Sequence, residues 1–228
     1  MNEQSTANTA EYISTSPTAM PVLETKRLVI RRLTLDDLPL VHQVYADAGW
    51  LDPALSPEET LVQRRRWLEW TVRNYDALAD LYQPPSGDRA IARKLDGAVV
   101  GLVGLAQALG PYGQLLYYQQ HHLAADDGLN MPEFGLFWAL LKEHQGQGYA
   151  TEAARAIIDY AFSTLNLKRI IATTDYDNQS SASVMRRLGM SIEHNPRKTP
   201  EWLQVVGVLE NPKITPTHNE ETTRELSR

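Results

Sequence analysis

The fold is constrained most by a buried strand that turns through two glycines into a long amphipathic helix. Residues 133–141 form an apolar run that predicts the strand, and Gly146 and Gly148 follow it. Apolar residues then recur at three- and four-residue steps, as on one face of a helix: Ala150, Ala153, Ala154, Ile157, Ile158, Ala161, Phe162 and Leu165. A strand followed by such a helix favours an α/β fold in which the helix packs across a sheet.

Further strands and helices extend this unit in both directions. Thr34 with Asp37, and Ser56 with Glu59, are spaced like capping pairs that begin helices. We expect strands at 26–33, 89–95, 98–109, 133–141, 168–174, 190–195 and 202–209, and helices at 34–45, 56–72, 150–165 and 178–188. The early strands form a meander with a tight turn at 96–97, and the later ones alternate with helices. This order predicts a mixed sheet with helices on both faces.

Residues 110–130 are expected to form a long loop or insertion, because a Gly-Pro pair breaks the strand pattern there. Its aromatic content is unusual for a connection, and long loops are often functional. His121 and His122, near Asp126 and Asp127, raise the question of a metal site. Adjacent histidines point in different directions in most backbones and no further ligand cluster is present, so we expect a polar loop and no metal.

Composition places limits on the class of protein. The 228 residues suffice for one sizeable domain. Residues 1–23 and 211–228 are small or polar and are expected to be disordered tails, which leaves a folded body at 24–210. Residues 1–23 contain no Lys or Arg, and no apolar run approaches the roughly 20 residues of a membrane span. We therefore expect a cytoplasmic protein without a membrane partner.

Charge and cysteine content exclude several functions. The net charge of −6 argues against nucleic acid as the main partner, since an acidic protein does not attract phosphate backbones. The chain contains no cysteine, so disulfides, cysteine-based zinc sites and a thiol nucleophile are absent. A transferase built from this chain would have to bring donor and acceptor together in one complex.

The segment 145–151 has the features of an anion site. Glycines at a strand-to-helix corner allow close backbone approach, and the first turn of a helix offers unpaired N–H groups. A pyrophosphate is the natural ligand, although a glycine-containing tight turn is the plain alternative. A Walker loop would need Gly-Lys-Ser/Thr, and here Tyr149 and Ala150 follow Gly148. A dinucleotide fingerprint would need a third glycine at Thr151 and an acid about twenty residues later, and both are missing.

The remaining pattern is Gln/Arg-x-x-Gly-x-Gly/Ala, which Gln145, Gly148 and Ala150 fill. This loop resembles that of the GNAT superfamily of N-acetyltransferases. Other segments resemble its RimJ/RimL-like branch, which acetylates ribosomal proteins, in the expected order along the chain: 23–28, 133–138, 148–153 and 178–190.

The resemblance implies a GNAT fold of about seven strands, in which two central parallel strands splay apart and bind acetyl-CoA. It implies that the backbone of Trp138, Ala139 and Leu140 pairs with the pantetheine arm of the donor. The pyrophosphate would be held by the amides of Gly146, Gln147, Gly148, Tyr149, Ala150 and Thr151. Asn178 would bond the pantetheine or hold the splay open, and it could equally be a helix N-cap.

The resemblance also implies the catalytic residues. Glu133 would act as the base, directly or through water, or else be a strand-end glutamate in solvent. Ser181 would give a proton to the leaving sulfur, or else be an ordinary first-turn serine. Many relatives carry a tyrosine for this purpose where this chain has Met185.

The function implied is transfer of acetyl from acetyl-CoA to a primary amine, on a peptide or protein N-terminus or on a small molecule, by a monomer or homodimer. A non-catalytic acyl-CoA sensor or scaffold on the same fold is the alternative, and acylation with a longer chain is a third.

Overall fold

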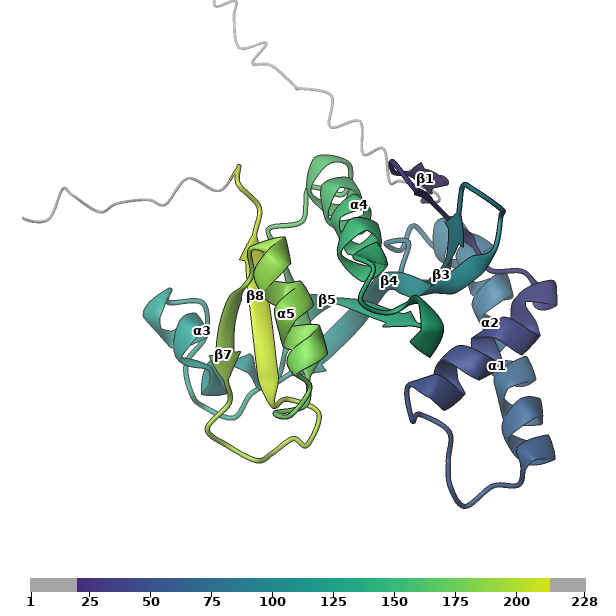
Figure 1. Cartoon of the computed structure of the whole chain (residues 1–228). Coiled ribbons are helices and arrows are strands. Elements are labelled where there is room, and N and C mark those ends of the chain that lie inside the picture. Colours follow the sequence, from purple (N-terminus) through teal and green to yellow (C-terminus); the bar gives the residue numbers. More distant parts are fainter. Residues whose placement is uncertain (1–19, 214–228) are drawn as a thin grey trace, which may run out of the picture.

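The computed structural model describes residues 20–213 and contains one mixed sheet in the order β1-β2-β3-β4-β5-β6-β8-β7 (Figure 1). The strands are β1 (Leu23–Glu24), β2 (Leu28–Arg32), β3 (Gly87–Arg93), β4 (Val99–Gly110), β5 (Met131–Leu140), β6 (Arg169–Thr174), β7 (Ser191–His194) and β8 (Val205–Glu210). Within the described part of the chain, β5 and β6 pair in parallel and all other neighbouring strands pair antiparallel. The predicted mixed sheet is confirmed, with the short β1 as an eighth strand.

Helices cover both faces of this sheet. They are α1 (Leu38–Asp47), α2 (Pro57–Asp80), α3 (Leu116–Gln120), α4 (Tyr149–Ser163) and α5 (Gln179–Leu188), with 3-10 turns η1 (Leu35–Asp37), η2 (Tyr112–Gln114) and η3 (Lys142–His144). No helix within residues 20–213 combines the length and the apolarity that a membrane crossing requires.

Local sequence signals explain where the helices begin and end. Ser56 Oγ accepts a hydrogen bond from the Glu59 amide at 3.3 Å, and the Glu59 carboxylate accepts from the Ser56 amide at 2.8 Å, which confirms the expected capping box of α2. Asn178 caps α5, and Gly189 ends it with φ of 85°, a left-handed conformation that suits glycine.

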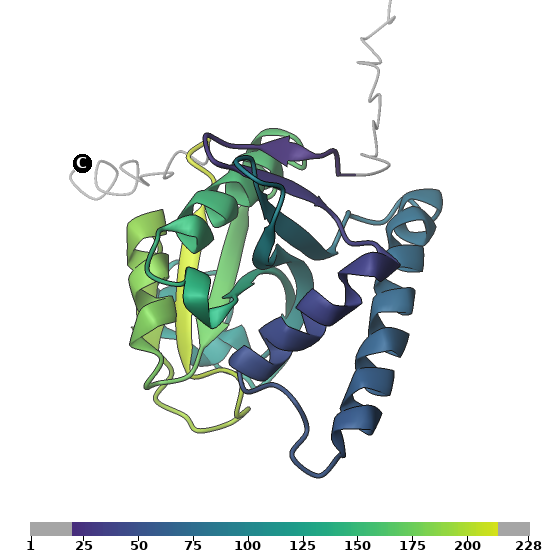
Figure 2. The same cartoon turned by 45° about the vertical axis from the view of Figure 1, so that its right-hand side comes forward.

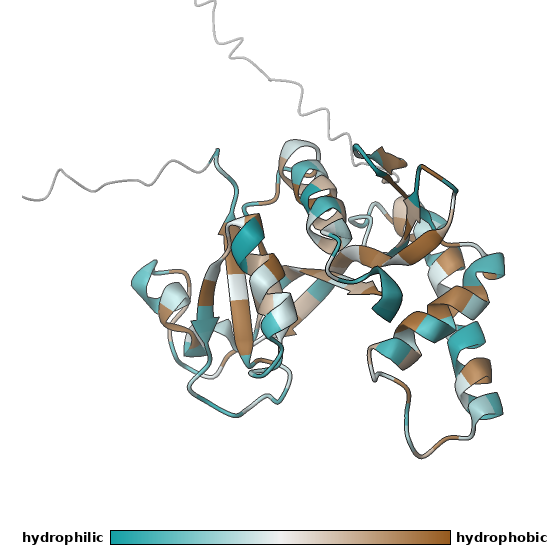
Figure 3. Ribbon diagram, in the orientation of Figure 1, coloured by the Kyte–Doolittle hydropathy of each residue, from teal (hydrophilic) through white to brown (hydrophobic). Residues whose placement is uncertain are grey.

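The two faces carry separate apolar layers. On one face, α4 and α5 lie next to each other and pack on β2 to β6 through residues such as Ile157, Ile158 and Met185 (Figure 1). On the other face, α1 and α2 lie together over β3, β4 and β5 (Figure 2). The strands are largely apolar, whereas the helices carry polar residues on their outer sides (Figure 3). This arrangement leaves the junction of β5 and β6 between two groups of helices.

The segment 110–130, expected as a long loop or insertion, is an insertion with helical turns of its own. It contains η2 and α3, and the side chains of Tyr112, Leu115 and Tyr118 are completely buried. They pack on Ile171 of β6 and Val206 of β8, and so cover the second half of the sheet. The three residues recur at three-residue steps, a helical spacing too short to stand out beside the Gly-Pro break.

The folded body extends beyond the expected limits of 24–210. Met20 is 2% exposed and belongs to the core beneath α4, and Leu23 pairs with Ile30. Asn211 is 5% exposed and donates hydrogen bonds to the carbonyls of Phe162 and Leu167, at 3.3 and 2.9 Å. The rest of the expected tails, residues 1–19 and 214–228, lie outside the described residues.

Close contact between β3, β4 and β5 predicts a stability difference between two glycines. A Cβ at Gly104 would lie 2.2 Å from the Gly87 carbonyl oxygen and 2.9 Å from the Phe137 ring, whereas one at Gly135 would come no nearer than 3.5 Å to another atom. We expect Gly104→Ala to lower the free energy of unfolding by about 1–3 kcal/mol through overpacking, and Gly135→Ala to lower it less. Urea denaturation measures both, and equal midpoints would contradict the packing described.

Candidate functional site

The site is built around the place where β5 and β6 separate. The two strands share a single register pair, Gly135 with Ile171, although β5 continues to Leu140 and β6 to Thr174. On its other side β5 is paired with β4 along its whole length. The second half of β5 therefore has one free edge, as the expected splay requires.

The pleat of β5 decides which backbone groups face this free edge. The Leu141 amide donates to the Val100 carbonyl at 3.0 Å, so residues at alternate positions from 141, including Ala139, direct their backbone groups to β4. Trp138 and Leu140 then direct theirs to the open side. In this register the backbone groups of Ala139 face β4, and those of Trp138 and Leu140 face the side where a strand could be added.

The glycine loop is shaped by two residues with positive φ and by its own glutamines. Gly146 and Gly148 have φ of 73° and 80°, a region that side chains disfavour. Gln145 Nε2 donates to the Leu140 carbonyl at 3.2 Å, and Gln147 Nε2 donates to the Glu143 carbonyl at 3.2 Å. Both glutamine side chains fold back and hold the loop against the end of β5.

The first turn of α4 presents N–H groups that no side chain caps. The N-cap is Gly148, and the Glu152 amide makes the first bond of the helix, 3.0 Å to the Gly148 carbonyl. Within residues 20–213, no acceptor bonds the amides of Tyr149, Ala150 and Thr151. Thr151 Oγ1 is also buried without a partner in the described chain. Unpaired donors beside glycines fit a diphosphate, as in other helix N-terminal anion sites.

Asn178 and Ser181 follow β6, the strand on the other side of the opening from β5. Asn178 Oδ1 accepts from the Ser181 amide at 3.0 Å, so the N-cap interpretation of Asn178 is confirmed. The half-buried Ser181 hydroxyl makes no hydrogen bond to another residue of the described chain. Met185 lies on the inner side of α5 and is completely buried. Ser181 therefore has a hydroxyl that is available to a ligand, whereas Met185 offers no polar group there.

Glu133 is not a solvent-exposed strand end. Its exposure is 7%, and Arg169 Nε and Nη2 each lie 2.6 Å from Glu133 Oε1. The Arg169 guanidinium lies 5.2 Å from the Tyr118 ring centre. Glu133 Oε2 has no hydrogen bond to another residue in the range 20–213. The carboxylate is thus fixed by an ion pair through one oxygen and is almost completely buried.

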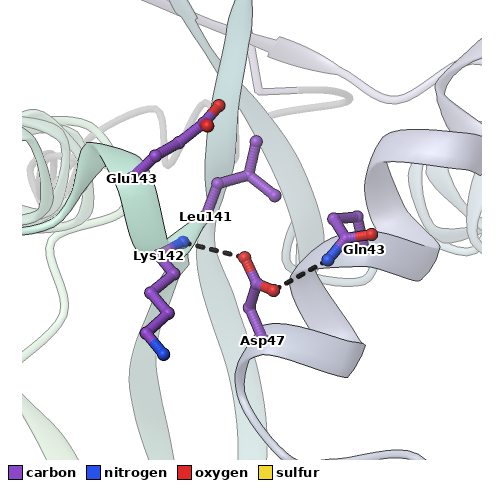
Figure 4. Close-up of a pocket in the computed structure, with 5 residues that line it drawn as sticks. All are labelled: Gln43, Asp47, Leu141, Lys142 and Glu143. Carbon is purple, nitrogen blue, oxygen red and sulfur yellow. Dashed lines mark hydrogen bonds between the residues drawn. The ribbon is translucent and has the colours of Figure 1, made fainter.

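A pocket of about 430 Å³ borders the end of β5 on the α1 side, lined by Gln43, Asp47, Leu141, Lys142 and Glu143 (Figure 4). Asp47 closes it by accepting from the Lys142 amide and from Gln43 Nε2, both at 2.8 Å. The hydrogen bond from the Lys142 amide is the main reason why the pKa of Asp47 lies below its usual value, and the bond from Gln43 adds to the effect. Sequence analysis missed Asp47, because its partner is 95 residues away and no local pattern marks it.

Asp88 is a second acid that the sequence analysis did not find. It pairs with Gly104, which pairs with Phe137, so the three share a row across β3, β4 and β5. Burial raises the pKa of Asp88 to about 7, and the Arg64 guanidinium partly offsets this effect. A carboxyl group that titrates near neutrality therefore lies on the α1 and α2 face of the sheet.

No group of three or more His, Asp or Glu side chains that could hold a metal ion occurs within residues 20–213.

Comparisons with known proteins agree with this geometry. Residues 27–191 match the family model described as an acetyltransferase (GNAT) domain. Spermidine N(1)-acetyltransferase of Escherichia coli is 29% identical over 167 residues, which cover 72% of this chain and 73% of that protein. The uncharacterized N-acetyltransferase YoaA of Bacillus subtilis is 26% identical over 177 residues, covering 76% and 84%.

Solved structures share the fold. An acetyltransferase from Agrobacterium tumefaciens superposes with a TM-score of 0.59 at 24% identity, covering 84% of this chain and 95% of that one. RimL, a ribosomal alpha-N-protein acetyltransferase in complex with coenzyme A, superposes with a TM-score of 0.53 at 15% identity, covering 82% and 96%. At these identities the likeness concerns the fold alone.

The glycine loop predicts that Gly148→Val abolishes binding of coenzyme A. Valine at φ of 80° is strained, and its Cβ would lie 3.5 Å from Arg27 Nη2 at the start of α4. Isothermal titration calorimetry with coenzyme A measures the effect. Gly97→Val is the matched control, because Gly97 has φ of 73° and open space around it in a distant turn. Unchanged affinity in Gly148→Val would disprove the placement of the anion site.

Proposed function

The chain belongs to the GNAT acetyltransferase family, and we propose that it transfers acetyl from acetyl-CoA directly to a primary amine within one complex. It is an acyl-CoA-dependent acetyltransferase by family. The observation that carries the proposal is the free edge of β5 next to the uncapped N-terminus of α4. The absence of cysteine agrees with direct transfer, because no thiol can hold the acetyl group in between.

The donor would lie along this free edge. The backbone groups of Trp138 and Leu140 would pair with the amides of the pantetheine arm, in the manner of an added strand. The amides from Gly146 to Thr151 would bind the diphosphate. Asn178 caps α5. It follows β6, across the opening from β5, and would also contact the pantetheine from that side.

The chemistry needs a proton acceptor for the amine and a proton donor for the thiolate. The lone pair of the neutral amine attacks the thioester carbonyl carbon, the C–N bond forms and the C–S bond breaks. Glu133 Oε2, directly or through a bound water, would take the proton that the amine loses. The Ser181 hydroxyl, or a water, would give a proton to the CoA thiolate, since the buried thioether of Met185 cannot.

The acceptor would approach between α1 and α2 on one side and α3 on the other. Similarity to spermidine N(1)-acetyltransferase supports a small amine, while the RimJ/RimL-like motifs support a peptide or protein N-terminus. Asp88 and Asp47 lie on the α1 side of this face, and carboxylates favour a cationic amine. The cytoplasmic location and the monomeric or dimeric state remain predictions.

The proposal predicts acetyl-CoA-dependent thiol release in the presence of a suitable amine. The assay reads the free thiol of CoA with a thiol-reactive dye, and the cysteine-free chain contributes no background signal. Spermidine with other small polyamines, amino acids, and peptides with free N-termini form three separate pools. Release with one pool establishes transfer and identifies the acceptor class.

The control in each pool is the Gly148→Val variant, which should release no thiol. If the wild-type protein releases no thiol in any pool but binds coenzyme A measurably, the result contradicts catalysis. It then favours a sensor that binds acyl-CoA without turnover.

The proposed proton donor predicts a kinetic change without a binding change. In Ser181→Ala we expect kcat to fall by about 10²-fold, as when a general acid is lost, with the Kd for coenzyme A and the melting temperature kept. Ser180→Ala, one residue away on the exposed side of α5, is the matched control and should keep its kcat. An unaffected kcat in Ser181→Ala would assign the proton to water. The same assay on Glu133→Gln tests the base, and an unchanged kcat there would exclude it.

A further inference from the structure

An arginine on the first hairpin of the chain contacts the glycine loop from a position 120 residues earlier in the chain. Arg27 lies between β1 and β2, and its side chain is 44% exposed. Its Nε donates to Glu152 Oε2 at 2.6 Å, and its Nη1 donates to the Gln147 carbonyl at 3.1 Å. The guanidinium also lies 4.6 Å from the ring centre of Tyr149. One side chain therefore contacts the loop, the first residue of α4 and its first turn.

Glu152 connects the same hairpin to α4. Its Oε1 accepts from Thr25 Oγ1 at 2.6 Å and from the Arg27 amide at 2.9 Å. Burial works to raise the pKa of Glu152, but hydrogen bonds from Thr25 and from the Arg27 amide and guanidinium outweigh it and keep the pKa below its usual value. Glu152 is therefore ionised at neutral pH, one helical turn from the amides that would bind the diphosphate.

The Arg27 contacts determine the orientation of the loop. The Gln147 carbonyl points toward Arg27. Helix α4 begins directly after it, and within the described chain the N–H groups of Gly148 and Tyr149 remain free. The guanidinium also lies close to Gly148, because a Cβ at that residue would be 3.5 Å from Arg27 Nη2. Arg27 thus contacts the loop and places a positive charge beside both Glu152 and Gly148.

We propose that Arg27 is a positioning residue of the donor site, which sets the affinity for the diphosphate of acetyl-CoA through the loop and through its charge. The inference rests on the proposed function. Without Arg27, the Glu152 carboxylate would face a diphosphate with no intervening cation, and like charges at short range repel. The pantetheine and the thioester would lie along β5, away from the glycine loop, so their binding should not depend on Arg27 and Glu152.

This role predicts a loss that depends on the diphosphate. In Arg27→Ala, the Kd for coenzyme A should rise about tenfold, as expected when a charged hydrogen-bonding group is removed. The value of kcat at saturating acetyl-CoA should stay the same. The kcat/KM for S-acetylpantetheine, which has no diphosphate, should also stay the same. Calorimetry gives the Kd, and thiol release gives the kinetic constants.

Three further variants separate charge from general structure. Arg27→Lys keeps the charge but not the forked contacts and should bind with intermediate affinity. Adding Glu152→Gln to Arg27→Ala should restore part of the affinity, because the uncompensated carboxylate is gone. Lys94→Ala is the matched control, since Lys94 pairs with Glu24 of the same hairpin at 2.8 Å but does not contact the loop, and its affinity should equal that of the wild type.

Two results would overturn the inference: an unchanged Kd for coenzyme A in Arg27→Ala, or an equal loss with coenzyme A and S-acetylpantetheine, which would indicate a general structural effect. Failure of the proposed function looks different. In that case the wild-type protein itself would release no thiol from acetyl-CoA with any amine pool, whether or not it binds coenzyme A, and the effect of Arg27→Ala on the Kd would be independent of that result.

Discussion

The structure depends on a break in the hydrogen-bonded ladder between β5 and β6. After the single pair of Gly135 and Ile171, the backbone groups of Trp138 and Leu140 have no strand beside them. Buried backbone groups without partners are costly, so a fold can keep such a break only where something else satisfies them. The helices divide around the same place, with α1 and α2 over one half of the sheet and α3 over the other. The proposed surfaces for the donor and the acceptor would thus meet at this break in the sheet.

Much of this architecture could be predicted because its signals are local. The capping residues Ser56 and Glu59, the helical spacing of α4 and the C-terminal Gly189 each act within a few residues, and the structure agrees with them. The glycine loop also has a local pattern, so its place between β5 and α4 followed from the sequence. The pattern does not contain the pleat of β5, which turns the backbone groups of Ala139 toward β4.

The features that the sequence analysis missed all depend on contacts between distant segments. The segment with Tyr112 and Tyr118 has a single helical turn of its own, and it is ordered by β6 and β8, which come later in the chain. Glu133 reads as a strand-end acid until Arg169 is placed beside it. The position of Asp88 relative to Phe137 follows from the register of three strands, which alternation of polar and apolar residues does not fix.

The bonds of Glu152 to Thr25 and Arg27 span 127 and 125 residues of the chain. During synthesis the first hairpin leaves the ribosome long before the helix that it must meet. Closing so large a loop has an entropic cost that is recovered only when both ends are in place. The proposed donor site therefore needs both of these distant segments, and a chain that ends before α4 would leave Thr25 and Arg27 without their partner Glu152.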